Sequence, residues 1–499
     1  MKRRFIRIHN DDNLIVALEK LEANEIIQIG EIEFALVDDI KQGHKVAIKY
    51  IREGESIIKY GHAIGHATAD IKSGSWIHSH NTKTNLSDKI SYNYLPIKFS
   101  ENKSDSKIPT FLGYKRKNGK VGTRNEIWII NTVGCVNTTA ERIAKICSEK
   151  FKSENFDGIF SFSHPYGCSQ LGDDLENTQK VLSGLIQNPN AGGVLVIGLG
   201  CENNQMSSLL NHVVTFNKER IRSFNSQDVN DEIDEGVKLV GELFELMKND
   251  KREKCPVSEL TLGMKCGGSD GFSGISANAL VGRITDLETS FNGRVILTEV
   301  PEMFGVEQQL MNRAKSIEVY EKIVSMINSF KEYFINHHQP IYENPSPGNK
   351  EGGLTTLEEK SLGAIQKGGT SQITQVLDYG EQITERGLAL LKAPGNDGVS
   401  STAMTASGAS MILFTTGRGT PLGFPVPTIK ISSNSDLFNK KTNWIDFNAG
   451  QVLDGTKNID QLAEEFFNFI IDVASGKIKT KNELNGYKEI AIWKEGVTL

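Results

Sequence analysis

The chain has 499 residues, which exceeds the size at which a single hydrophobic core usually stops growing, so we expect two or three domains. Its formal net charge of −6 and its pI near 6.0 argue against nucleic acid or an anionic membrane as partner, because both attract basic surfaces. Neither a signal-peptide core nor a stretch of about 18 apolar residues is evident. We therefore expect a cytoplasmic globular protein.

Residues 1–97 alternate short apolar and polar runs between glycine-containing turns. This pattern predicts a small β-rich domain, with one amphipathic helix near residues 13–22. A polar stretch rich in Lys and Ser follows at 98–110, and its composition is typical of an exposed linker.

Beyond this linker, buried-looking apolar strands alternate with helices, which indicates parallel sheets. We expect a first α/β domain at 111–250 and, after the charged break KNDKREK, a C-terminal α/β domain at 255–499. The predicted fold class is thus α/β: a β-rich N-terminal domain followed by a two-part α/β body with mainly parallel sheets.

Four of the six cysteines come at or just after the end of an apolar strand, each beside glycine: Cys135, Cys168, Cys201 and Cys266. In α/β proteins, ligands gather beyond the carboxyl ends of the strands, and glycine lets the backbone approach a ligand closely. Four thiols would then converge on one site, where thiolate is a suitable ligand for iron. Small buried residues behind tight turns are the alternative, and no CxxC pair decides between the two.

The histidines form a second group. His78 and His80 stand two apart in IHSHN, so on a strand they project from the same face and are able to bind one metal ion. Two solvated imidazoles at a strand end are the alternative. His44 is isolated in sequence, whereas His164 shares a strand-end loop with Cys168.

Four glycine-rich polar runs, at 265–274, 344–353, 392–398 and 415–421, combine backbone amides with hydroxyl, amide or cationic side chains. Recognition of a polyhydroxy acid requires this combination. A single run of this kind is usually an ordinary turn, but four in one domain favour a shared ligand site. None fits a phosphate-binding or dinucleotide-binding loop, so nucleotide binding is not expected.

Arg418 follows an apolar strand in the last of these runs, where a guanidinium would clamp a carboxylate through two hydrogen bonds. The carboxylates of Asp270, Glu299 and Glu302 complete the inventory. Glu299 stands at a strand end in TEVPEM, which suits a metal ligand or a general base; a solvated loop acid is the alternative.

Long runs of the sequence, taken in order, resemble the altronate dehydratase family, whose relatives include galactarate dehydratase and the two-subunit sulfolactate lyase. The runs cover essentially the whole chain: KYGHAIGHATADIKSGSWIHSHN, GYKRKNGKVGTRNEIWIINTVGCVN, FSHPYGCSQLGDD, GGVLVIGLGCENNQ, TEVPEM, PSPGNKEGGLTTLEEKSLG, LFTTGRGTP and WIDFNAG. One departure is Ala364, where altronate dehydratases often carry cysteine, and we interpret that thiol as dispensable.

The resemblance implies an N-terminal domain similar to the SAF type, a requirement for divalent iron, and dehydration of a sugar acid. The histidine pair of IHSHN favours altronate, which would give 2-keto-3-deoxy-gluconate in hexuronate catabolism. Galactarate or another hexonate, a sulfolactate-type elimination, and a non-catalytic sugar-acid-binding protein are the alternatives. A homo-oligomer is compatible with the sequence.

Such a dehydration is a β-elimination: a base removes the C2 proton, an acid protonates the departing C3 hydroxyl, and a metal ion neutralises the developing charge. The candidates for catalysis are His164, Glu299, Asp270, Cys168, Cys201 and Cys266. The candidates for substrate binding are Arg418, Lys350, Asn349, Ser269 and Arg124. Fe²⁺, or Mn²⁺ in its place, would be bound by His78, His80, His44 and Cys135. The alternative cofactor is an iron–sulfur cluster on the four strand-end cysteines.

Overall fold

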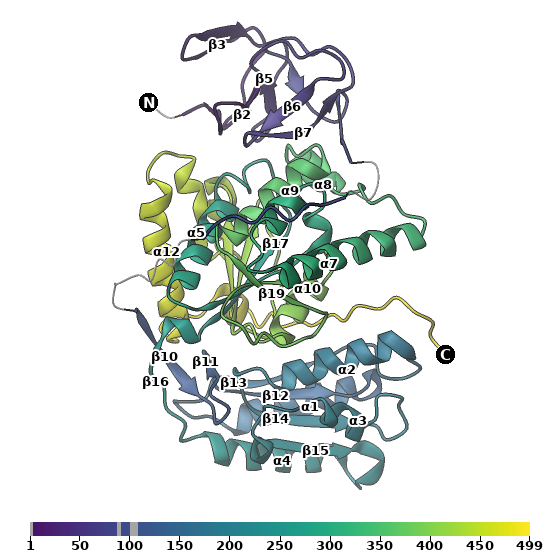
Figure 1. Ribbon diagram of the computed structural model, residues 1–499. Helices are drawn as coiled ribbons and strands as arrows, with labels where there is room; N and C mark the ends of the chain where they lie inside the picture. Colours follow the sequence, from purple (N-terminus) through teal and green to yellow (C-terminus); the bar gives the residue numbers. More distant parts are fainter. Residues whose placement is uncertain (1–2, 87–90, 100–107) are drawn as a thin grey trace.

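The computed structural model describes residues 3–86, 91–99 and 108–499 and arranges them in three domains (Figure 1). The N-terminal domain lies at one end, the C-terminal α/β domain in the middle, and the first α/β domain at the other end. The order in space therefore differs from the order in the chain. Part of the expected linker, 100–107, lies outside the described residues.

The N-terminal domain consists of short antiparallel strands in three small sheets, with the strand orders β1-β2-β5-β8, β3-β4 and β6-β7-β9. Its strands are β1 (Phe5–Ile6), β2 (Leu14–Ala17), β3 (Ile26–Ile29), β4 (Ile32–Ala35), β5 (Lys45–Ala47), β6 (Ser56–Lys59), β7 (His62–Ala67), β8 (Trp76–Ile77) and β9 (Thr82–Lys83). The expected β-rich fold of this part is confirmed.

The helix expected near residues 13–22 is wrong, because Leu14–Ala17 forms strand β2. Leu14 and Val16 belong to one hydrophobic cluster, whereas Ile15 and Ala17 belong to another. Since successive residues of a strand point to opposite faces, a strand buried on both faces reads as a continuous apolar run. Its sequence then lacks the alternation that would separate it from a buried helix.

The first α/β domain has a four-stranded parallel sheet in the order β13-β12-β14-β15. Its elements are β12 (Glu126–Asn131), α1 (Asn137–Lys150), β13 (Gly158–Phe162), α2 (Gly172–Ile186), β14 (Ala191–Gly198), α3 (Met206–Asn211), β15 (Ile221–Asn225) and α4 (Glu232–Met247). A small antiparallel sheet of β11 (Val121–Gly122), β10 (Thr110–Lys115) and β16 (Glu253–Pro256) carries the chain into and out of this domain.

The C-terminal domain has a seven-stranded parallel sheet in the order β19-β20-β18-β17-β21-β22-β23. Its strands are β17 (Thr261–Cys266), β18 (Arg294–Leu297), β19 (Ile373–Leu377), β20 (Gly387–Leu391), β21 (Met411–Thr416), β22 (Thr428–Ser432) and β23 (Phe447–Asn448). The main helices are α5 (Ala277–Ser290), α6 (Glu307–Met311), α7 (Ile317–Asn336), α8 (Pro347–Glu351), α9 (Leu357–Ile365), α10 (Asp397–Ala406), α11 (Ser435–Lys440), α12 (Ile459–Ala474) and α13 (Lys481–Leu484). The α/β class with mainly parallel sheets is thereby confirmed.

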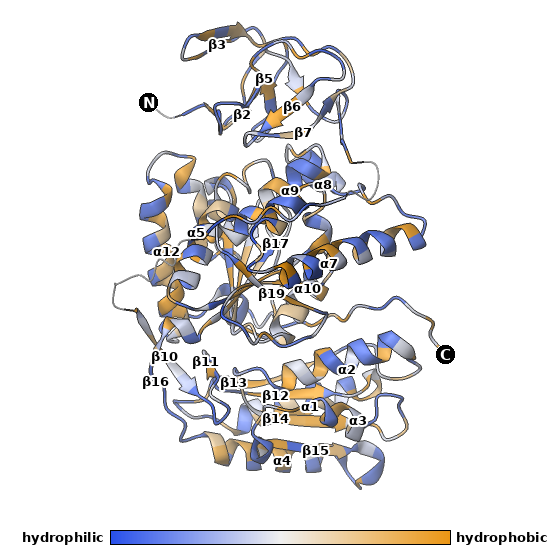
Figure 2. Cartoon of the chain, in the orientation of Figure 1, coloured by the Kyte–Doolittle hydropathy of each residue, from blue (hydrophilic) through white to orange (hydrophobic). Residues whose placement is uncertain are grey.

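The central strands of both sheets are apolar along most of their length, as Figure 2 shows for β12 and β14. Every residue of β12, β14, β17 and β21 is buried. Helices cover both faces of such sheets, which leaves no face for polar side chains. The two α/β domains share one hydrophobic cluster, in which α2 and α10 pack together.

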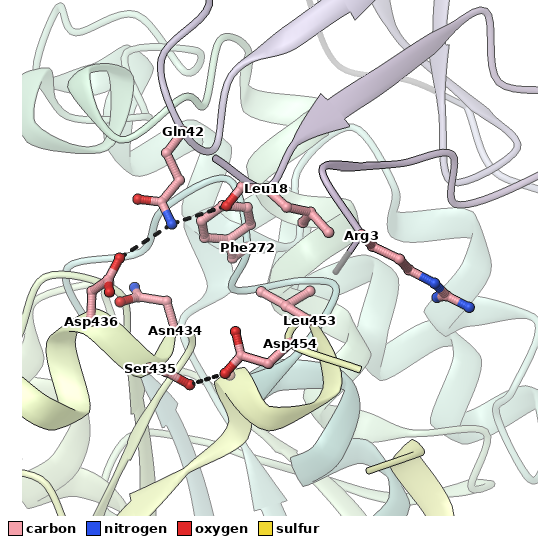
Figure 3. Close-up of a pocket in the computed structure, with 10 residues that line it drawn as sticks. Arg3, Leu18, Gln42, Phe272, Asn434, Ser435, Asp436, Leu453 and Asp454 are labelled. Carbon is pink, nitrogen blue, oxygen red and sulfur yellow. Dashed lines mark hydrogen bonds between the residues drawn. The ribbon is translucent and has the colours of Figure 1, made fainter. Parts of the chain in front are cut away.

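The N-terminal domain is fixed to the C-terminal domain by shared apolar residues and by a buried ion cluster. The ammonium groups of Lys45 and Lys59 lie 2.9 and 2.7 Å from the two carboxylate oxygens of Glu359 on α9, and all three side chains are fully buried. At the same junction Gln42 donates to Asp436 over 3.3 Å, beside a cavity of about 40 Å³ (Figure 3). This cavity is too small for a sugar acid.

Among the described residues, no helix combines the length and the apolar character that crossing a membrane requires.

Candidate active site

A pocket of about 440 Å³ opens beyond the carboxyl ends of four adjacent strands of the C-terminal sheet, β20, β18, β17 and β21. Cys266 is the last residue of β17, Glu302 follows β18, Asp397 begins α10 after β20, and Arg418 follows β21. The pocket is lined by Cys266, Gly267, Gly268, Ser269, Glu302, Asn344, Ser346, Gly348, Asn349, Lys360, Gly395, Asn396, Asp397 and Arg418. This is the edge at which α/β sheets bind ligands.

Below the pocket, Glu299 is fully buried between two lysines. Its carboxylate forms ion pairs with Lys265 and, over 2.9 Å, with Lys367, and it accepts the backbone N–H of Cys266 over 3.1 Å. Glu299 has a φ of 73°, a left-handed conformation that is uncommon for a residue with a side chain. Such strain persists where surrounding contacts impose it, and here these are the paired charges.

The Cys266 thiol lies between a cation and an anion. Lys367 donates to its sulfur over 2.7 Å, and the sulfur lies 3.1 Å from a carboxylate oxygen of Glu302. Burial raises the pKa of the Cys266 thiol, and the carboxylates of Glu299 and Glu302 raise it further. Cys266 is therefore a neutral thiol that donates to Glu302.

Glu302 reaches the pocket with its charge stabilised. Burial disfavours its ionised form, but Lys360, at 2.9 Å, and the more distant Lys367 and Lys265 hold its pKa at about 2. Asp397 pairs with Lys265 over 2.9 Å. Three ammonium groups therefore face three carboxylates around one thiol.

Among the described residues, one group of three His, Cys, Asp or Glu side chains has ligand atoms that all lie within 4.8 Å of one another: Cys266, Glu299 and Glu302. Their spacing suits a metal ion, but their charge environment does not. Lysine ammonium groups already occupy these donors, and a divalent cation beside Lys265, Lys360 and Lys367 would be repelled. We therefore interpret this group as a proton-transfer network and not as a metal centre.

Three of the expected substrate-binding residues line the pocket: Ser269, Asn349 and Arg418. Asn349 donates to the carbonyl of Ser269 over 2.8 Å and so connects α8 to the loop after β17. The half-exposed Arg418 guanidinium pairs with Glu351 over 3.0 Å. An exposed pair of this kind contributes little free energy, so a substrate carboxylate is able to replace Glu351.

Asp270, expected in catalysis, is buried and does not line the pocket. Its carboxylate accepts hydrogen bonds from the hydroxyls of Ser273 and Ser433, from the amide of Asn434, and from the N–H of Phe272. These bonds fix the glycine-rich loop at 265–274.

The histidines of the N-terminal domain lie against α8, which also contributes Gly348 and Asn349 to the pocket. The indole N–H of Trp76 donates to Nδ1 of His44 over 3.1 Å, so Nε2 carries the proton and donates to the carbonyl of Glu351. Both ring nitrogens of His44 are thus engaged, which leaves no lone pair for a metal ion.

His78 and His80 differ from His44 in this respect. His78 donates through Nε2 to the carbonyl of Lys350 over 2.9 Å, and its Nδ1 accepts the hydroxyl of the neighbouring Ser79 over 3.0 Å. His80 is exposed, and its ring packs against Trp76. Rotation of the Ser79 hydroxyl would free Nδ1 of His78, and His80 forms no hydrogen bond among the described residues. The backbone of Lys350 contacts His78, but Lys350 is not among the residues that line the pocket.

Two further expected site residues are engaged in holding the fold. His164 is buried in the first α/β domain, where Nε2 donates to the carbonyl of Asn131 and Nδ1 accepts the N–H of Tyr166. Arg124 is buried and forms a two-fold ion pair with Glu483 on α13, at 2.6 and 3.0 Å. Neither lines the pocket.

The four strand-end cysteines do not meet at one site. Cys135, Cys168 and Cys201 follow β12, β13 and β14 of the first α/β domain, whereas Cys266 ends β17 of the C-terminal domain. The chain terminus, which bonds to Ser169, lies beside the lower domain in Figure 1, while α8 lies at the top of the middle domain. The two groups are therefore separate.

Comparisons with known proteins cover nearly all of the chain. The SAF domain of altronate/galactarate dehydratases matches residues 3–85, the second domain of D-galactarate dehydratase/altronate hydrolase matches 113–248, and the C-terminal domain of D-galactarate/altronate dehydratases matches 257–498. Altronate dehydratases from Bacillus subtilis (strain 168) and Escherichia coli (strain K12) are 51% and 50% identical, over 100% and 99% of this chain and 100% of each relative. Galactarate dehydratase (L-threo-forming) of Escherichia coli (strain K12) is 34% identical, over 98% of this chain and 96% of its own length.

The chain belongs to the altronate/galactarate dehydratase family.

Sequence reasoning missed the lysines of this altronate/galactarate dehydratase site. Lys265 stands directly before Cys266 in an otherwise apolar strand, and a lysine in such a strand is a signal in itself, since buried lysines are almost always paired. Lys360 and Lys367 come from α9 and the turn that follows it, and only the packing of that segment against β17 and against residues 300–302 brings them to the site. Asp397 was within a recognised polar run but was not singled out.

Proposed function

We infer that this chain dehydrates altronate to 2-keto-3-deoxy-gluconate, a step of hexuronate breakdown, in the pocket beyond β17, β18, β20 and β21. The observation that carries the proposal is full-length identity of about one half to two altronate dehydratases, together with a pocket that combines carboxylate, amide and cationic side chains. An acid with five hydroxyl groups requires such a mixed lining, because every buried hydroxyl needs a partner.

The substrate carboxylate is held by Arg418 at the pocket mouth. The guanidinium offers two parallel N–H groups, and its present partner Glu351 is exposed and readily displaced. Asn349 and Ser269 line the same space. The Asn349 amide is held by Ser346 and the Ser269 carbonyl, so the Ser269 hydroxyl is the group that binds a sugar hydroxyl.

Glu302 is the group that accepts the C2 proton. It lines the pocket, its carboxylate is ionised, and Lys360 beside it stabilises the negative charge that develops on the substrate carboxylate as the C2 proton leaves. The Cys266 thiol, which donates to Glu302, keeps the carboxylate oriented and is itself held by Lys367. The C3 hydroxyl departs as water when the proton that Glu302 took from C2 is returned to it, and the resulting enol becomes the 2-keto acid as its hydroxyl proton is lost and C3 takes up a proton.

Divalent iron, with Mn²⁺ as an alternative, is the metal ion that we propose for this reaction. Its protein ligands would be the exposed His80 and His78, whose Nδ1 is bonded to the rotatable hydroxyl of Ser79, and imidazole suits iron. When bound, the ion would act as a Lewis acid on the carboxylate and hydroxyl oxygens of the substrate.

A cytoplasmic location accompanies this proposal. All six cysteines are free thiols, which is typical of a reducing compartment.

The direct test is formation of 2-keto-3-deoxy acid from altronate by protein that has been purified without oxygen and supplied with Fe²⁺. We expect turnover that a chelator abolishes and that added Fe²⁺ restores. Turnover that persists fully after chelation would overturn the metal proposal, and absence of product under all conditions would overturn the reaction itself.

A further inference from the structure

Three cysteines of the first α/β domain have no part in the pocket described above, yet their surroundings repeat. Cys135, Cys168 and Cys201 each follow a glycine at the end of neighbouring parallel strands. The strand order β13-β12-β14 places the three loops side by side at one edge of the sheet, and the strand ends are in register from Phe162 to Ile130 to Val196.

The loops of Cys135 and Cys168 contact one another through their backbones. The N–H of Gly134 donates to the carbonyl of Tyr166 over 2.9 Å. A Cβ atom on Gly134 would lie 2.8 Å from the carbonyl oxygen of His164, and one on Gly167 would lie 2.0 Å from that of Thr132. Glycine is therefore required before both cysteines, because any side chain would separate the loops.

The loop of Cys201 joins the same assembly. The N–H of Asn204 donates to the carbonyl of Gly167 over 3.0 Å, and its side-chain amide donates to the carbonyl of Thr132 over 2.8 Å. The N–H of Ser169 donates to the side chain of Asn203 over 2.8 Å. Each of the three cysteines is thus within three residues of a contact to a neighbouring loop.

Exposure distinguishes these three thiols from the others. Cys135, Cys168 and Cys201 are exposed, whereas Cys147, Cys255 and Cys266 are buried. Free cysteine is among the residues most often found buried, so three exposed thiols on adjoining loops need a reason, such as a shared ligand.

Buried polar atoms beside the cysteines also lack partners among the described residues. The Nε2 of Gln170, two residues after Cys168, is buried without an acceptor, and the Oδ1 atoms of Asn131 and Asn204 are buried without a donor. The amide N–H of Gln170 is able to donate a hydrogen bond to a sulfide or thiolate sulfur. Helix α1 begins directly after this site, has no acidic residue in its first turn, and favours negative charge at its N-terminus.

We propose that Cys135, Cys168 and Cys201 bind an iron–sulfur cluster of the [4Fe–4S] type. Each thiol loses its proton and binds one iron, and the fourth iron has no cysteine and is open to a small oxygen ligand. Thiolates bound to different irons of a cluster stand farther apart than the ligands of one ion, and three loops at one sheet edge provide such a spacing. This site is separate from the pocket and does not depend on the activity proposed there.

The test uses the full-length protein, reconstituted without oxygen with Fe²⁺, inorganic sulfide and a thiol reductant. We expect broad visible absorbance, with iron and acid-labile sulfide each at about four per chain. Cys135→Ser, Cys168→Ser and Cys201→Ser should each lose this absorbance and most of the bound sulfide. Cys147→Ala, in the same domain, and Cys266→Ala, in the other, should retain both.

Circular dichroism and thermal unfolding of the cluster-free variants show whether the loss comes from the site or from a failure to fold. A variant that melts like the parent and binds no cluster supports the proposal. Iron or zinc bound without sulfide, a disulfide among the three cysteines, or absorbance that survives all three substitutions would overturn it. Altronate turnover is measured separately. If the reconstituted protein dehydrates altronate but contains no cluster, the cluster proposal alone is rejected. If it contains the cluster but does not dehydrate altronate, the proposed function alone is rejected.

Discussion

Three lysines surround the thiol of Cys266 and the carboxylates of Glu299 and Glu302, and this arrangement decides which groups carry a proton. Burial by itself would neutralise such carboxylates. The neighbouring ammonium groups instead keep Glu302 ionised, with a pKa of about 2. Burial and the carboxylates of Glu299 and Glu302 raise the pKa of the Cys266 thiol, so that it stays protonated although the lysines lower this pKa. A carboxylate that stays charged at the edge of a pocket is suited to accept a proton only when substrate binding changes its surroundings.

The first prediction concerns Glu302. Glu302→Gln keeps the size of the side chain but removes the proton acceptor, so kcat for altronate dehydration should fall by roughly 100-fold or more. Glu343→Gln, which changes an exposed carboxylate directly before the pocket-lining Asn344, should leave kcat unchanged. Measurement of product formation with both variants, at equal thermal stability, checks this. Near-parental kcat in Glu302→Gln would exclude it as the C2 base.

Arg418 and Arg124 separate substrate binding from structural support. Arg418→Ala should raise the KM for altronate by roughly 10- to 100-fold, because it removes hydrogen bonds to a charged carboxylate, and should leave the melting temperature unchanged. Arg124→Ala leaves the buried Glu483 carboxylate without its partner, so it should lower the free energy of unfolding by about 3–5 kcal/mol without raising KM. Steady-state kinetics and chemical unfolding of both variants test these two roles. A raised KM in Arg124→Ala together with a destabilised Arg418→Ala would contradict both assignments.

The histidine ligands give a prediction on metal affinity. The double variant His78→Ala, His80→Ala should bind Fe²⁺ at the chelatable site at least tenfold more weakly, as loss of ligand groups implies. His62→Ala, an exposed histidine on β7, is the matched control. Anaerobic titration with Fe²⁺, followed by equilibrium dialysis, reads this independently of activity. Unchanged Fe²⁺ affinity in the double variant would place the ion elsewhere.

At the scale of elements, α9 connects the N-terminal domain to the catalytic edge of the large sheet. Glu359, within this helix, pairs with two buried lysines of the N-terminal domain, and Lys360, the next residue, pairs with Glu302 in the pocket. Helix α8 has a similar position, because its carbonyls accept hydrogen bonds from the histidines and its residues Gly348 and Asn349 line the pocket. The docking of the N-terminal domain and the geometry of the pocket are thus coupled through short segments.

Glu359→Gln tests this docking. The substitution leaves Lys45 and Lys59 as uncompensated buried charges, so the free energy of unfolding should fall by about 3–5 kcal/mol. Glu33→Gln, at an exposed position of the N-terminal domain, is the control. Chemical unfolding at neutral pH measures both, and an unchanged Glu359→Gln midpoint would show that the junction relies on its apolar contacts alone.

The contribution of Glu359, Lys45 and Lys59 to the stability of the fold depends on pH. Burial would raise the pKa of Glu359, but Lys45 and Lys59 hold it well below its ordinary value of 4.5. A carboxyl group whose pKa is lower in the folded state stabilises the fold above its unfolded pKa, and this contribution is lost as the pH falls. Acidification below about pH 4.5 should therefore destabilise the parent more than Glu359→Gln.

At the scale of the whole molecule, the sequence predicts that reactive side chains lie at the ends of strands, but it does not predict which of them share one site. Cys266 ends an apolar strand, and Glu299 and Arg418 follow apolar strands. Ligands bind at that edge of such sheets, so the place of these residues near one pocket follows from the pattern. Cys135, Cys168 and Cys201 also follow apolar strands, but these strands belong to the other sheet. Which strands share a sheet depends on long-range pairing, and the local pattern carries no record of it.

Two other features, the lysines of the site and the bonded state of two histidines, could not be predicted from the sequence. Lys360 and Lys367 reach the site through a crossover segment that is distant in sequence, so no spacing relates them to Cys266. His44 and His164 are residue types suited to metal binding and proton transfer, but partners in the folded chain occupy all their ring nitrogens. Sequence identifies the donor, and only the fold shows whether it is free.

The central claim is that this molecule eliminates water from altronate, and the most direct test is the ratio of kcat/KM values on altronate, galactarate and mannonate, measured side by side with Fe²⁺-supplied protein. We predict 2-keto-3-deoxy acid from altronate, with a kcat/KM that exceeds that of either other acid by at least tenfold. A preference for galactarate or mannonate would keep the reaction and contradict the substrate, and no turnover of any of the three would contradict the account as a whole.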